Sequence, residues 1–376
     1  MSQALPAGIE QRAWGELSDG RAVREFTLRA ASGLVLRAIN YGGIVSALEV
    51  PDREGQLASV VLGLPKLRDY EARNPHMGTI VGRHANRIGG ARFALDGREV
   101  KLEPNEGANI LHGGARGFGK VWWDIEPLPL AGDGSAAIAL RYTSADGEGG
   151  FPGTMDVQVR YTLGPGFEWR IDYEARSDKT TVVNLSHHDY FNLRGHGDVM
   201  DHRLLIPASR YCPIDAERIP TGLAPVEGTP FDFREGPRIG ERIREPHEQI
   251  QRGKGYDHNF AIDSAQAPGD GMRFIARLAD PSSGRAMDIQ STEPGLQFYS
   301  GNYLDGSLEG SGGSLIRQGD GLCLETQHFP DAPNHPEFAS TRLAAGELFK
   351  SSTVMRFSTF GAGDDPFASL SEDHRA

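Results

Sequence analysis

Cysteine, long apolar runs and basic charge are all scarce in this chain of 376 residues, and each scarcity excludes a class of protein. Cys212 and Cys323 are the only cysteines. Two are too few for a disulfide framework, so we expect a reducing compartment. No apolar run approaches the ~20 residues that cross a bilayer. The first residues lack a basic segment followed by an apolar block, so they form no signal peptide. We therefore predict a soluble, cytoplasmic protein without a membrane partner.

Basic side chains are outnumbered by acidic ones. The chain has 39 lysines and arginines against 51 aspartates and glutamates, which gives a formal net charge of -12. Nucleic acids and anionic membranes bind to basic surfaces, so this balance argues against both as partners. It also disfavours a heavily phosphorylated substrate. The sequence leaves the oligomeric state open.

The common motifs for nucleotides, dinucleotides and metals are missing as well. Residues 114–121, GARGFGKV, nearly match a phosphate-binding P-loop. Val121 stands where the magnesium-binding hydroxyl belongs, however, and the next residues indicate a strand and not the required helix. There is no complete G-x-G-x-x-G, no C-x-x-C and no H-E-x-x-H. The adjacent His187 and His188 would point to opposite faces of a strand, where metal ligands do not converge. We predict neither a metal nor a cofactor.

Helical periodicity is poor, whereas glycine, at 48 residues, and proline, at 23, are abundant. Both break helix interiors and suit a chain with many turns and short strands. Residues 157–163 and 167–175 strictly alternate apolar and polar side chains, and the Gly-Pro-Gly between them predicts an antiparallel hairpin. We predict an all-β fold, a large antiparallel β-sandwich that forms a single domain over residues 1–376. Its core covers about residues 20–360, and the polar residues 361–376 are expected to form a frayed tail.

Residues 182–195, VVNLSHHDYFNLRG, are an unusual stretch in which a β-branched run leads into two histidines, an aspartate and a tyrosine. Alternation along a strand places Ser186, His188 and Tyr190 on one face and His187 on the other. A histidine on a strand beside a phenol is suited to proton transfer near neutral pH. Taken alone, the segment slightly favours a half-buried histidine with a structural role.

Six other polar residues stand in stretches that a plain core does not explain, namely Asn86, Arg87, His112, Asp257, Gln297 and Glu325. Glu325 follows the apolar Cys323 and Leu324, and a buried carboxylate there is costly unless it has a partner or a function. Ordinary structural roles also fit some of the others: a surface charge for Arg87, a turn cap for Asp257, and bonding to buried backbone groups for Gln297. A pocket of amides, imidazoles, an arginine and carboxylates suits a neutral, polyhydroxylated ligand such as a sugar.

Six motifs, taken in order, resemble those of the aldose 1-epimerases, also called galactose mutarotases. They are GRHANRI (82–88), NEGANILHGG (105–114), NLSHHDYFNL (184–193), GYDHNF (255–260), PGLQFYSGN (294–302) and LETQHFPDAPNHP (324–336). The resemblance covers about residues 26–360 and is specific, because order and spacing both agree. It implies a large β-sandwich, a supersandwich, that interconverts the α and β anomers of a free aldohexose or aldopentose without a cofactor.

The resemblance also implies roles for individual residues. Glu325 would be the general base and His188 the general acid, and we expect their mutual attraction to keep Glu325 ionised and His188 protonated at neutral pH. His187 and Asp189 stand where the family more often has asparagine and a small hydroxyl residue. That departure bears on substrate preference, and His187 is expected to have only a supporting role. The implied sugar-binding residues are Asn86, Arg87, His112, Tyr190, Asp257 and Gln297.

Three alternatives draw on the same residues. A non-catalytic carbohydrate-binding module would not need both Glu325 and His188. A retaining glycosidase would need two close carboxylates, here Asp257 and Glu325. An epimerase for a hexose 6-phosphate would need clustered arginines, and the only dense group comprises Arg83, Arg87 and Arg92.

Overall fold

The computed structural model describes residues 7–265 and 269–370 of the chain. Strands dominate these residues, and neighbouring strands of the three large sheets pair antiparallel. The predicted all-β class and antiparallel architecture are confirmed. No helix within the described residues has the length and apolar character that a membrane span requires.

Three sheets form the body of the molecule. The first, in the order β1 to β5, contains Gly8–Glu16, Ala22–Arg29, Val35–Ile39, Val45–Pro51 and Leu57–Ser59. The second has eight strands in the order β11 (Asp124–Pro127), β12 (Ala136–Ser144), β13 (Met155–Gly164), β14 (Glu168–Ser177), β28 (Leu348–Thr359), β22 (Arg285–Ser291), β21 (Arg273–Asp280) and β17 (Arg203–Leu205). The third has the order β19 (Ala224–Pro225), β18 (Arg210–Tyr211), β20 (Asp257–Ala261), β23 (Gly295–Tyr299) and β26 (Cys323–Gln327).

The remaining strands form two-stranded pairs around these sheets. They are β6 (Thr79–Val81) with β16 (Ser186–His188), β7 (Arg87–Ile88) with β10 (Ile110–Leu111), β8 (Arg92–Leu95) with β9 (Arg98–Lys101), β15 (Thr181–Val182) with β27 (Arg342–Leu343), and β24 (Asp305–Glu309) with β25 (Leu315–Arg317). The α-helices of the described residues are short, α1 (Leu67–Arg73) and α2 (Glu248–Gly253). Short 3₁₀ turns cover Gly89–Ala91, Phe118–Lys120, Glu148–Gly150, Ile239–Glu241 and Ala332–Asn334.

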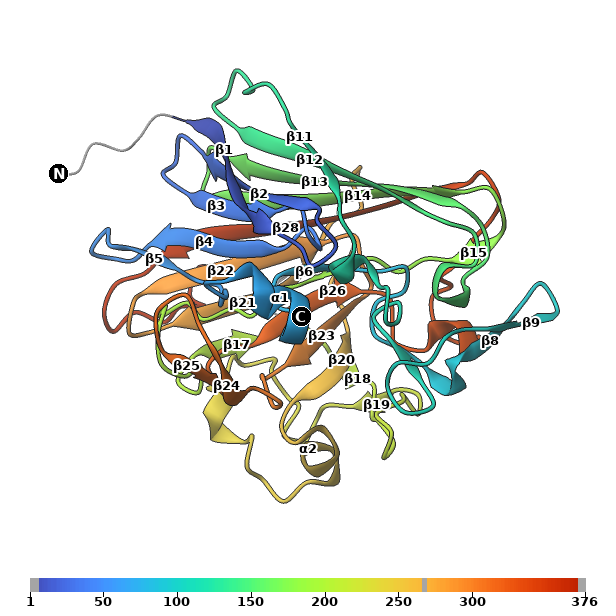
Figure 1. Cartoon of the computed structure of the whole chain (residues 1–376). Helices are drawn as coiled ribbons and strands as arrows, with labels where there is room; N and C mark the ends of the chain where they lie inside the picture. The colour runs from blue at the N-terminus through green and yellow to red at the C-terminus, as the bar shows by residue number, and fades with distance from the viewer. Residues whose placement is uncertain (1–6, 266–268, 371–376) are drawn as a thin grey trace.

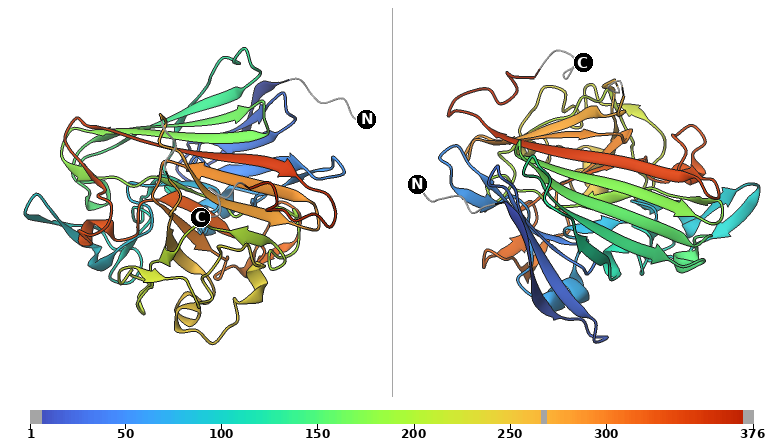
Figure 2. Two further views of the ribbon diagram at one scale, coloured as in Figure 1. Left: turned by 180° about the vertical axis from the view of Figure 1, so that it is seen from behind. Right: turned by 90° about the horizontal axis from the view of Figure 1, so that it is seen from above.

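The three sheets pack as layers around one continuous core. In Figure 1 the long strands β11 to β14 run across the top, and the sheet containing β20, β23 and β26 lies below them. Seen from above in Figure 2, the N-terminal strands, drawn in blue, cross the green strands at an angle. Side chains from each sheet meet in the largest apolar cluster, for example Phe26, Trp169 and Phe298. The predicted sandwich is thus a single core shared by distant parts of the sequence.

The predicted hairpin is confirmed, because β13 and β14 pair with Gly164 opposite Glu168. Residues 182–195 form less regular structure than their apolar start indicates. The named strands there are β15 and β16, and β16 pairs with β6, while Asn184 and Phe191 add only isolated bridges. β16 nevertheless carries both His187 and His188, so the alternation predicted for them applies.

The described part of the C-terminal tail, up to residue 370, corrects the expectation of a frayed end. Phe367 and Leu370 are buried in a cluster with Leu205 and Phe274. Arg277 donates hydrogen bonds to the carbonyl of Pro366 and to the Ser369 hydroxyl. Two apolar side chains in a polar segment are enough to dock it, since each removes a large apolar area from water. Residues 371–376 lie outside the described residues.

Candidate active site

One face of the third sheet carries the polar side chains that the sequence analysis selected. The strand register places Gln297 opposite Glu325 and Asn259 opposite Gln297, so alternation puts Asp257 on the same face. Phe298, on the opposite face, lies in the hydrophobic core. A pocket of about 250 Å³ lies against the polar face. Three adjacent strands therefore give this pocket a rigid floor.

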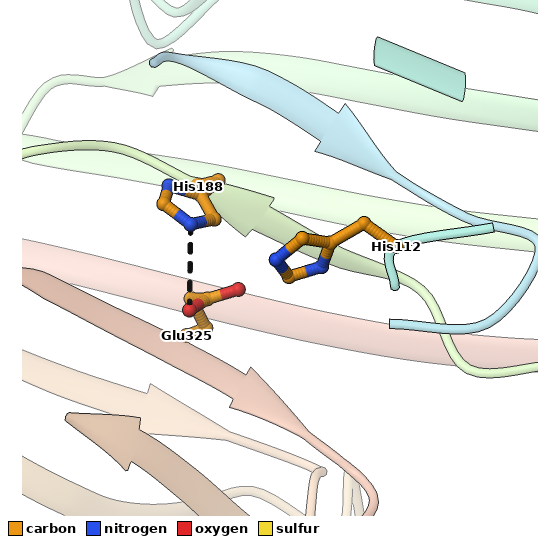
Figure 3. Close-up of side chains that lie close together, drawn as sticks. All are labelled: His112, His188 and Glu325. Atoms are coloured by element: carbon orange, nitrogen blue, oxygen red, sulfur yellow. Dashed lines mark ion pairs between the residues drawn. The ribbon is translucent and has the colours of Figure 1, made fainter. Parts of the chain in front are cut away.

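β16 packs beside β26 and brings His188 close to Glu325. Nε2 of His188 lies 3.8 Å from Oε1 of Glu325, and both side chains are buried (Figure 3). On the same strand, the Ser186 hydroxyl donates to the carbonyl of Thr326 and so ties β16 to β26. The sulfur of Cys323 lies 3.5 Å from Nδ1 of His188. Adjacent strands thus join two residues that are far apart in the sequence.

Burial sets the ionisation of this pair. It lowers the pKa of His188 to about 3, with a further lowering by the nearby His76. It raises the pKa of Glu325 well above its usual range, an effect that Asp257 reinforces and Arg87 opposes. Both shifts favour the uncharged forms, because the pocket takes the groups out of water. Burial therefore opposes the expected arrangement, with Glu325 ionised and His188 protonated, and favours a carboxylic acid beside a neutral imidazole.

His112 joins the pair from the turn that directly follows β10. Its ring stands nearly perpendicular to that of His188, with the centroids 5.2 Å apart. The backbone N–H of Asn86 donates to Nδ1 of His112 at 3.2 Å. From this bond we assign the neutral tautomer that carries its proton on Nε2, since Nδ1 must keep its lone pair to accept. Burial also lowers the pKa of His112 well below its usual value. His112 is therefore a hydrogen-bond donor through Nε2.

His112, His188 and Glu325 also form a group of described residues whose ligand atoms are close enough to hold a metal ion. One ligand atom from each residue lies within 4.8 Å of the others. A metal ion binds the lone pair of an imidazole nitrogen. The nitrogen of His112 that is not bonded to Asn86 carries the proton in the assigned tautomer. This donor set therefore suits a hydroxyl group of a ligand better than it suits a metal.

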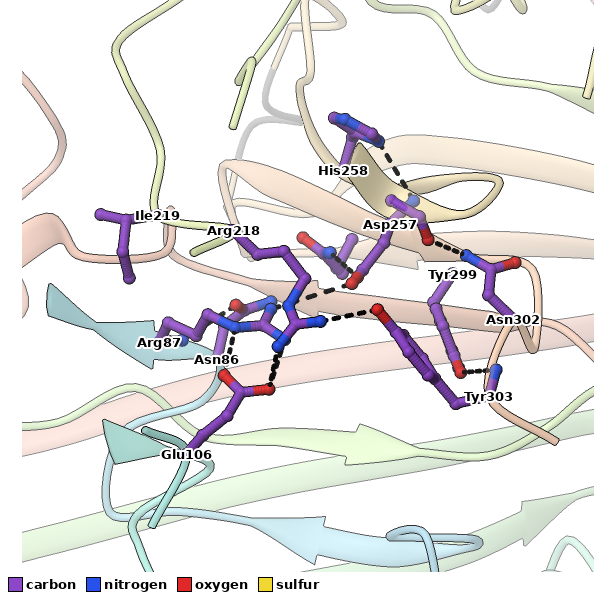
Figure 4. Close-up of polar contacts among 12 residues, drawn as sticks. Asn86, Arg87, Glu106, Arg218, Ile219, Asp257, His258, Tyr299, Asn302 and Tyr303 are labelled. Atoms are coloured by element: carbon purple, nitrogen blue, oxygen red, sulfur yellow. Dashed lines mark hydrogen bonds and ion pairs between the residues drawn. The ribbon is translucent and has the colours of Figure 1, made fainter. Parts of the chain in front are cut away.

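Two carboxylates hold Arg87 at the wall of the pocket. Its Nε and Nη2 donate to Glu106 at 2.6 and 3.0 Å, and its Nη1 lies 3.8 Å from Asp257 (Figure 4). Gln297 donates from Nε2 to Asp257 at 2.8 Å. Burial raises the pKa of Asp257, and Arg87 opposes this shift. Asn86 accepts the backbone N–H of Arg87 through Oδ1. This network fixes the directions of several donors and acceptors around the pocket.

The remaining predicted residues differ in their position. Tyr190 packs against His188 with ring centroids 5.1 Å apart, and its hydroxyl donates to the carbonyl of Pro75 at 3.0 Å. Gln297 contacts Asp257 but does not line the pocket, and its buried Oε1 has no partner among the described residues. The structure thus brings seven of the eight predicted site residues to the pocket wall and leaves Gln297 outside the lining.

His187 points away from the pocket into the core, as alternation predicted. Its Nδ1 lies 2.6 Å from Oδ2 of Asp189, and its Nε2 lies 2.8 Å from the hydroxyl of Tyr161. Because Tyr161 donates its own proton to the carbonyl of Gly43, Nε2–H of His187 donates to Tyr161. A proton must then lie between His187 and Asp189. Trp169 packs edge-on against the same imidazole. The two unusual residues therefore form a core network and not a part of the pocket wall.

Five polar or aromatic residues of the pocket wall escaped the sequence analysis, namely His76, Glu106, Arg218, Tyr299 and Tyr303. Glu106 and Tyr299 lie inside two of the six motifs, and alternation from Gln297 would have placed Tyr299 on the polar face. The other three come from loops without a periodic pattern. His76 adds a third imidazole, 5.7 Å from the ring of His188, and burial lowers its pKa to about 4.

Comparison with known proteins agrees with this geometry. The family model for aldose 1-epimerase matches residues 24–356. The chain belongs to the aldose 1-epimerase family. It is 42% identical to a galactose mutarotase of Rattus norvegicus over 93% of this chain and 98% of that protein. It is 36% identical to an aldose 1-epimerase of Escherichia coli strain K12, over 90% of this chain and 96% of that protein.

The fold comparison supports the same membership. The crystal structure of a galactose 1-epimerase from Lactobacillus acidophilus NCFM matches with a TM-score of 0.82 at 27% sequence identity, over 94% of this chain and 100% of that one. A homologue of the aldose epimerases from C. elegans matches with a TM-score of 0.78 at 26% identity, over 88% of this chain and 97% of that one. The resemblance, the isomerase class and the supersandwich fold predicted for this aldose 1-epimerase are confirmed.

Proposed function

We propose that this aldose 1-epimerase interconverts the α and β anomers of a free aldohexose or aldopentose, with Glu325 as general base and His188 as general acid. The observation that carries the proposal is the buried pair itself, 3.8 Å apart at a pocket of about 250 Å³. That volume lies just below the roughly 300–1,000 Å³ of pockets for drug-sized ligands, so it suits a single sugar ring.

The reaction consists of two coupled proton transfers. Glu325 removes the proton of the anomeric hydroxyl O1 while His188 gives a proton to the ring oxygen. The bond between C1 and the ring oxygen breaks, and C1 becomes an aldehyde carbon. Rotation about C1–C2 presents the other face of the carbonyl, and the reverse transfers close the ring to the other anomer. Each positioned acid or base contributes about 10²–10⁴-fold to the rate.

One internal proton shift converts the uncharged pair into the form that the reaction needs, with Glu325 ionised and His188 protonated. Moving the proton from Glu325 to His188 leaves the net charge of the pocket unchanged, so it needs no exchange with solvent. Hydroxyl groups of a bound sugar can hydrogen-bond to both charged partners and so stabilise them. The positive charge of Arg87 opposes the rise in the pKa of Glu325, and it therefore favours the same proton shift.

The other predicted residues supply hydrogen bonds to the sugar. His112 donates through Nε2–H, Arg87 donates through its guanidinium, and Asp257 accepts. Tyr190 and Asn86 complete the wall around them. Gln297, which bonds to Asp257, orients that carboxylate from outside the lining. Such convergent polar groups fix a ligand's orientation more than they add affinity.

The pairing of the arginines favours a free sugar over a hexose 6-phosphate. Arg87 and Arg218 both donate to Glu106, so neither is an unpaired cation. Arg83, part of the sequence cluster, is buried and donates to backbone carbonyls, and Arg92 is exposed outside the pocket lining. The cluster that a phosphate would need does not assemble at this pocket.

Family membership implies a sugar as the small-molecule partner. The cytoplasmic location and the lack of nucleic-acid and membrane partners stay predictions from the acidic composition and the two cysteines.

Replacement of the base tests the mechanism. Glu325→Gln keeps the size of the side chain and removes its ability to take a proton, so we expect the rate of anomer interconversion, followed by polarimetry, to fall about 10²-fold or more. His188→Gln should cause a comparable loss. The matched control is Glu309→Gln, because Glu309 is largely exposed at the end of β24, lies near Lys66 and does not line the pocket.

The assay uses galactose, glucose, xylose and arabinose, together with glucose 6-phosphate. Circular dichroism establishes that each variant is folded. A near-normal rate in folded Glu325→Gln protein would contradict the assignment of the base. A preference for glucose 6-phosphate over every free sugar would overturn the substrate class.

A further inference from the structure

One strand of the third sheet provides a partner for each ring nitrogen of His188. β26 carries Cys323 and Glu325, which are two residues apart and therefore point to the same face of the strand. Sγ of Cys323 lies 3.5 Å from Nδ1 of His188. Oε1 of Glu325 lies 3.8 Å from Nε2 of the same ring (Figure 3). The imidazole is thus held between a sulfur and a carboxyl group that a single strand positions.

Cys323 is a neutral thiol in this position. It is fully buried, and it belongs to an apolar cluster that includes Tyr190 and Tyr299. Burial raises the pKa of Cys323 well above its usual value, and the nearby Glu325 reinforces the rise. The sulfur atom of a thiol keeps lone pairs that accept a weak hydrogen bond. Cys323 can therefore orient the ring of His188 without bringing a charge to it.

The adjacent histidine of β16 shows what a charged partner does in the same place. Nδ1 of His187 lies 2.6 Å from the carboxylate of Asp189. A carboxylate beside Nδ1 stabilises the positive charge of an imidazolium and so makes it a weaker acid. A sulfur beside Nδ1 of His188 has no such effect. The two neighbouring histidines therefore have partners that suit a core network in one case and a proton donor in the other.

Only one tautomer of neutral His188 allows the proton shift from Glu325. Nε2 needs a free lone pair to receive that proton, so the ring must already carry its own proton on Nδ1, the nitrogen that faces Cys323. Although burial lowers the pKa of His188, a hydrogen bond to its own backbone acts in the opposite direction. A backbone carbonyl only accepts, so this bond also favours a proton on Nδ1, the nitrogen nearer the backbone. In the other tautomer Nε2 would be occupied and the shift blocked.

We propose that Cys323 is a positioning residue for the general acid, because its sulfur accepts a hydrogen bond from Nδ1–H of His188 and keeps the lone pair of Nε2 directed at Glu325. The inference rests on the proposed function, in which His188 acts as the acid. During the shift the O–H bond of Glu325 breaks and an N–H bond forms at Nε2. The ring oxygen of the sugar then takes this proton. The proton on Nδ1 and that of the thiol stay in place throughout.

Substitution of Cys323 tests the proposal by kinetics on galactose with the full-length protein. Cys323→Ala removes the acceptor, so kcat should fall about 3- to 10-fold, the effect of one hydrogen bond. KM should change little, because Cys323 does not line the pocket. Cys323→Ser should restore most of kcat, since a hydroxyl oxygen accepts in the same place. The matched control is Cys212→Ala, which removes the same atoms from a buried cysteine that packs with Phe329 and Phe338 outside the pocket lining. It should leave kcat unchanged.

The tautomer of His188 is a second and independent measurement. Side-chain ¹⁵N NMR at neutral pH without sugar distinguishes protonated from unprotonated ring nitrogens, and the spectrum of His188→Gln assigns the signals of His188. We expect the wild-type protein to carry the proton on Nδ1 and Cys323→Ala to contain a mixture of tautomers.

A proton on Nε2 in the wild-type protein would overturn the proposal, and so would wild-type kcat in folded Cys323→Ala. Equal losses of kcat in Cys323→Ala and Cys323→Ser would also overturn it, because they would reflect packing alone. If Cys323→Ala does not fold, the wild-type tautomer decides. Failure of the proposed function is distinct, since it would appear as a lack of anomer interconversion by the wild-type protein, whichever tautomer the spectrum shows.

Discussion

Acidification should destabilise this protein steeply, because its fold buries several histidines in the neutral form. Above about pH 6.5 an unfolded histidine is mostly neutral too, and the folded state has no disadvantage. Below that pH the unfolded chain binds protons that the fold does not, so stability falls as the pH falls toward the folded pKa values. Burial lowers the pKa of His76 and His202 to about 4, of His84, His188 and His258 to about 3, and of His112 well below its usual value.

The size of the effect follows from the number of protons taken up. Each such imidazole costs about 1.36 kcal/mol for every pH unit below its unfolded pKa. Glu325, Asp257, Asp320 and Asp331 act in the opposite direction, because burial raises their pKa values and favours protons that the unfolded chain has released. With all four protonated in the fold, the six imidazoles still leave a net uptake of about two protons, or roughly 3 kcal/mol per pH unit. Since domains have only about 5–15 kcal/mol of stability, we expect acid unfolding within a few units below pH 6.5.

Urea unfolding followed by tryptophan fluorescence, at several pH values between about 7 and 5, measures this slope. His84 is a suitable probe because it is buried and neither ring nitrogen has a partner among the described residues. His84→Leu should reduce the slope by about 1.36 kcal/mol per pH unit. The control is His196→Gln, since His196 is exposed. A free energy of unfolding that stays constant over this range, or an unaltered slope in His84→Leu, would refute the reasoning.

Two further predictions concern residues outside the pocket. Asp189→Ala should lower the free energy of unfolding by about 1–3 kcal/mol, because it leaves a nitrogen of the buried His187 without its partner. Asp189→Asn should lose less, since its amide can donate to that nitrogen, and equal losses in urea unfolding would contradict the network. Phe367→Ala should lower stability by about 3–5 kcal/mol, because this side chain is buried beside Leu205. An unchanged thermal midpoint would instead favour the frayed tail that the composition predicted.

The fold could be predicted where strands are neighbours in sequence. Strict alternation over residues 157–163 and 167–175 was enough to predict the β13–β14 hairpin, because a short turn allows only one pairing register between its two strands. The pairing of β14 with β28 has no comparable local signal, since its two strands lie at distant places in the chain. The docked tail was missed for a related reason. An average over residues 361–376 is polar, and it conceals that Phe367 and Leu370 are the residues that contact the core.

The residues of the candidate site likewise fall into those that the sequence could predict and those that it could not. Side chains on regular strands, such as Glu325 and His188, could be selected because alternation fixes the face to which they point. Arg218 and Tyr303 could not, because their place at the pocket wall depends on how separate loops come together over the floor. Alternation alone does not show which side chains line the pocket. Gln297 lies on the predicted face of its strand, yet it contacts Asp257 and does not line the pocket.

The ionisation of the catalytic pair could not be predicted from the sequence, because two large terms of opposite sign compete. At 3.8 Å and an effective dielectric constant of about 20, the attraction between a carboxylate and an imidazolium is roughly 4 kcal/mol. Removing the two ions from water costs several kcal/mol for each of them. The burial of Glu325 and His188, which only the three-dimensional structure reveals, increases the second term. The charged arrangement that ring opening needs must therefore draw its remaining stabilisation from the hydroxyl groups of the sugar, which makes the substrate itself a part of the acid–base system.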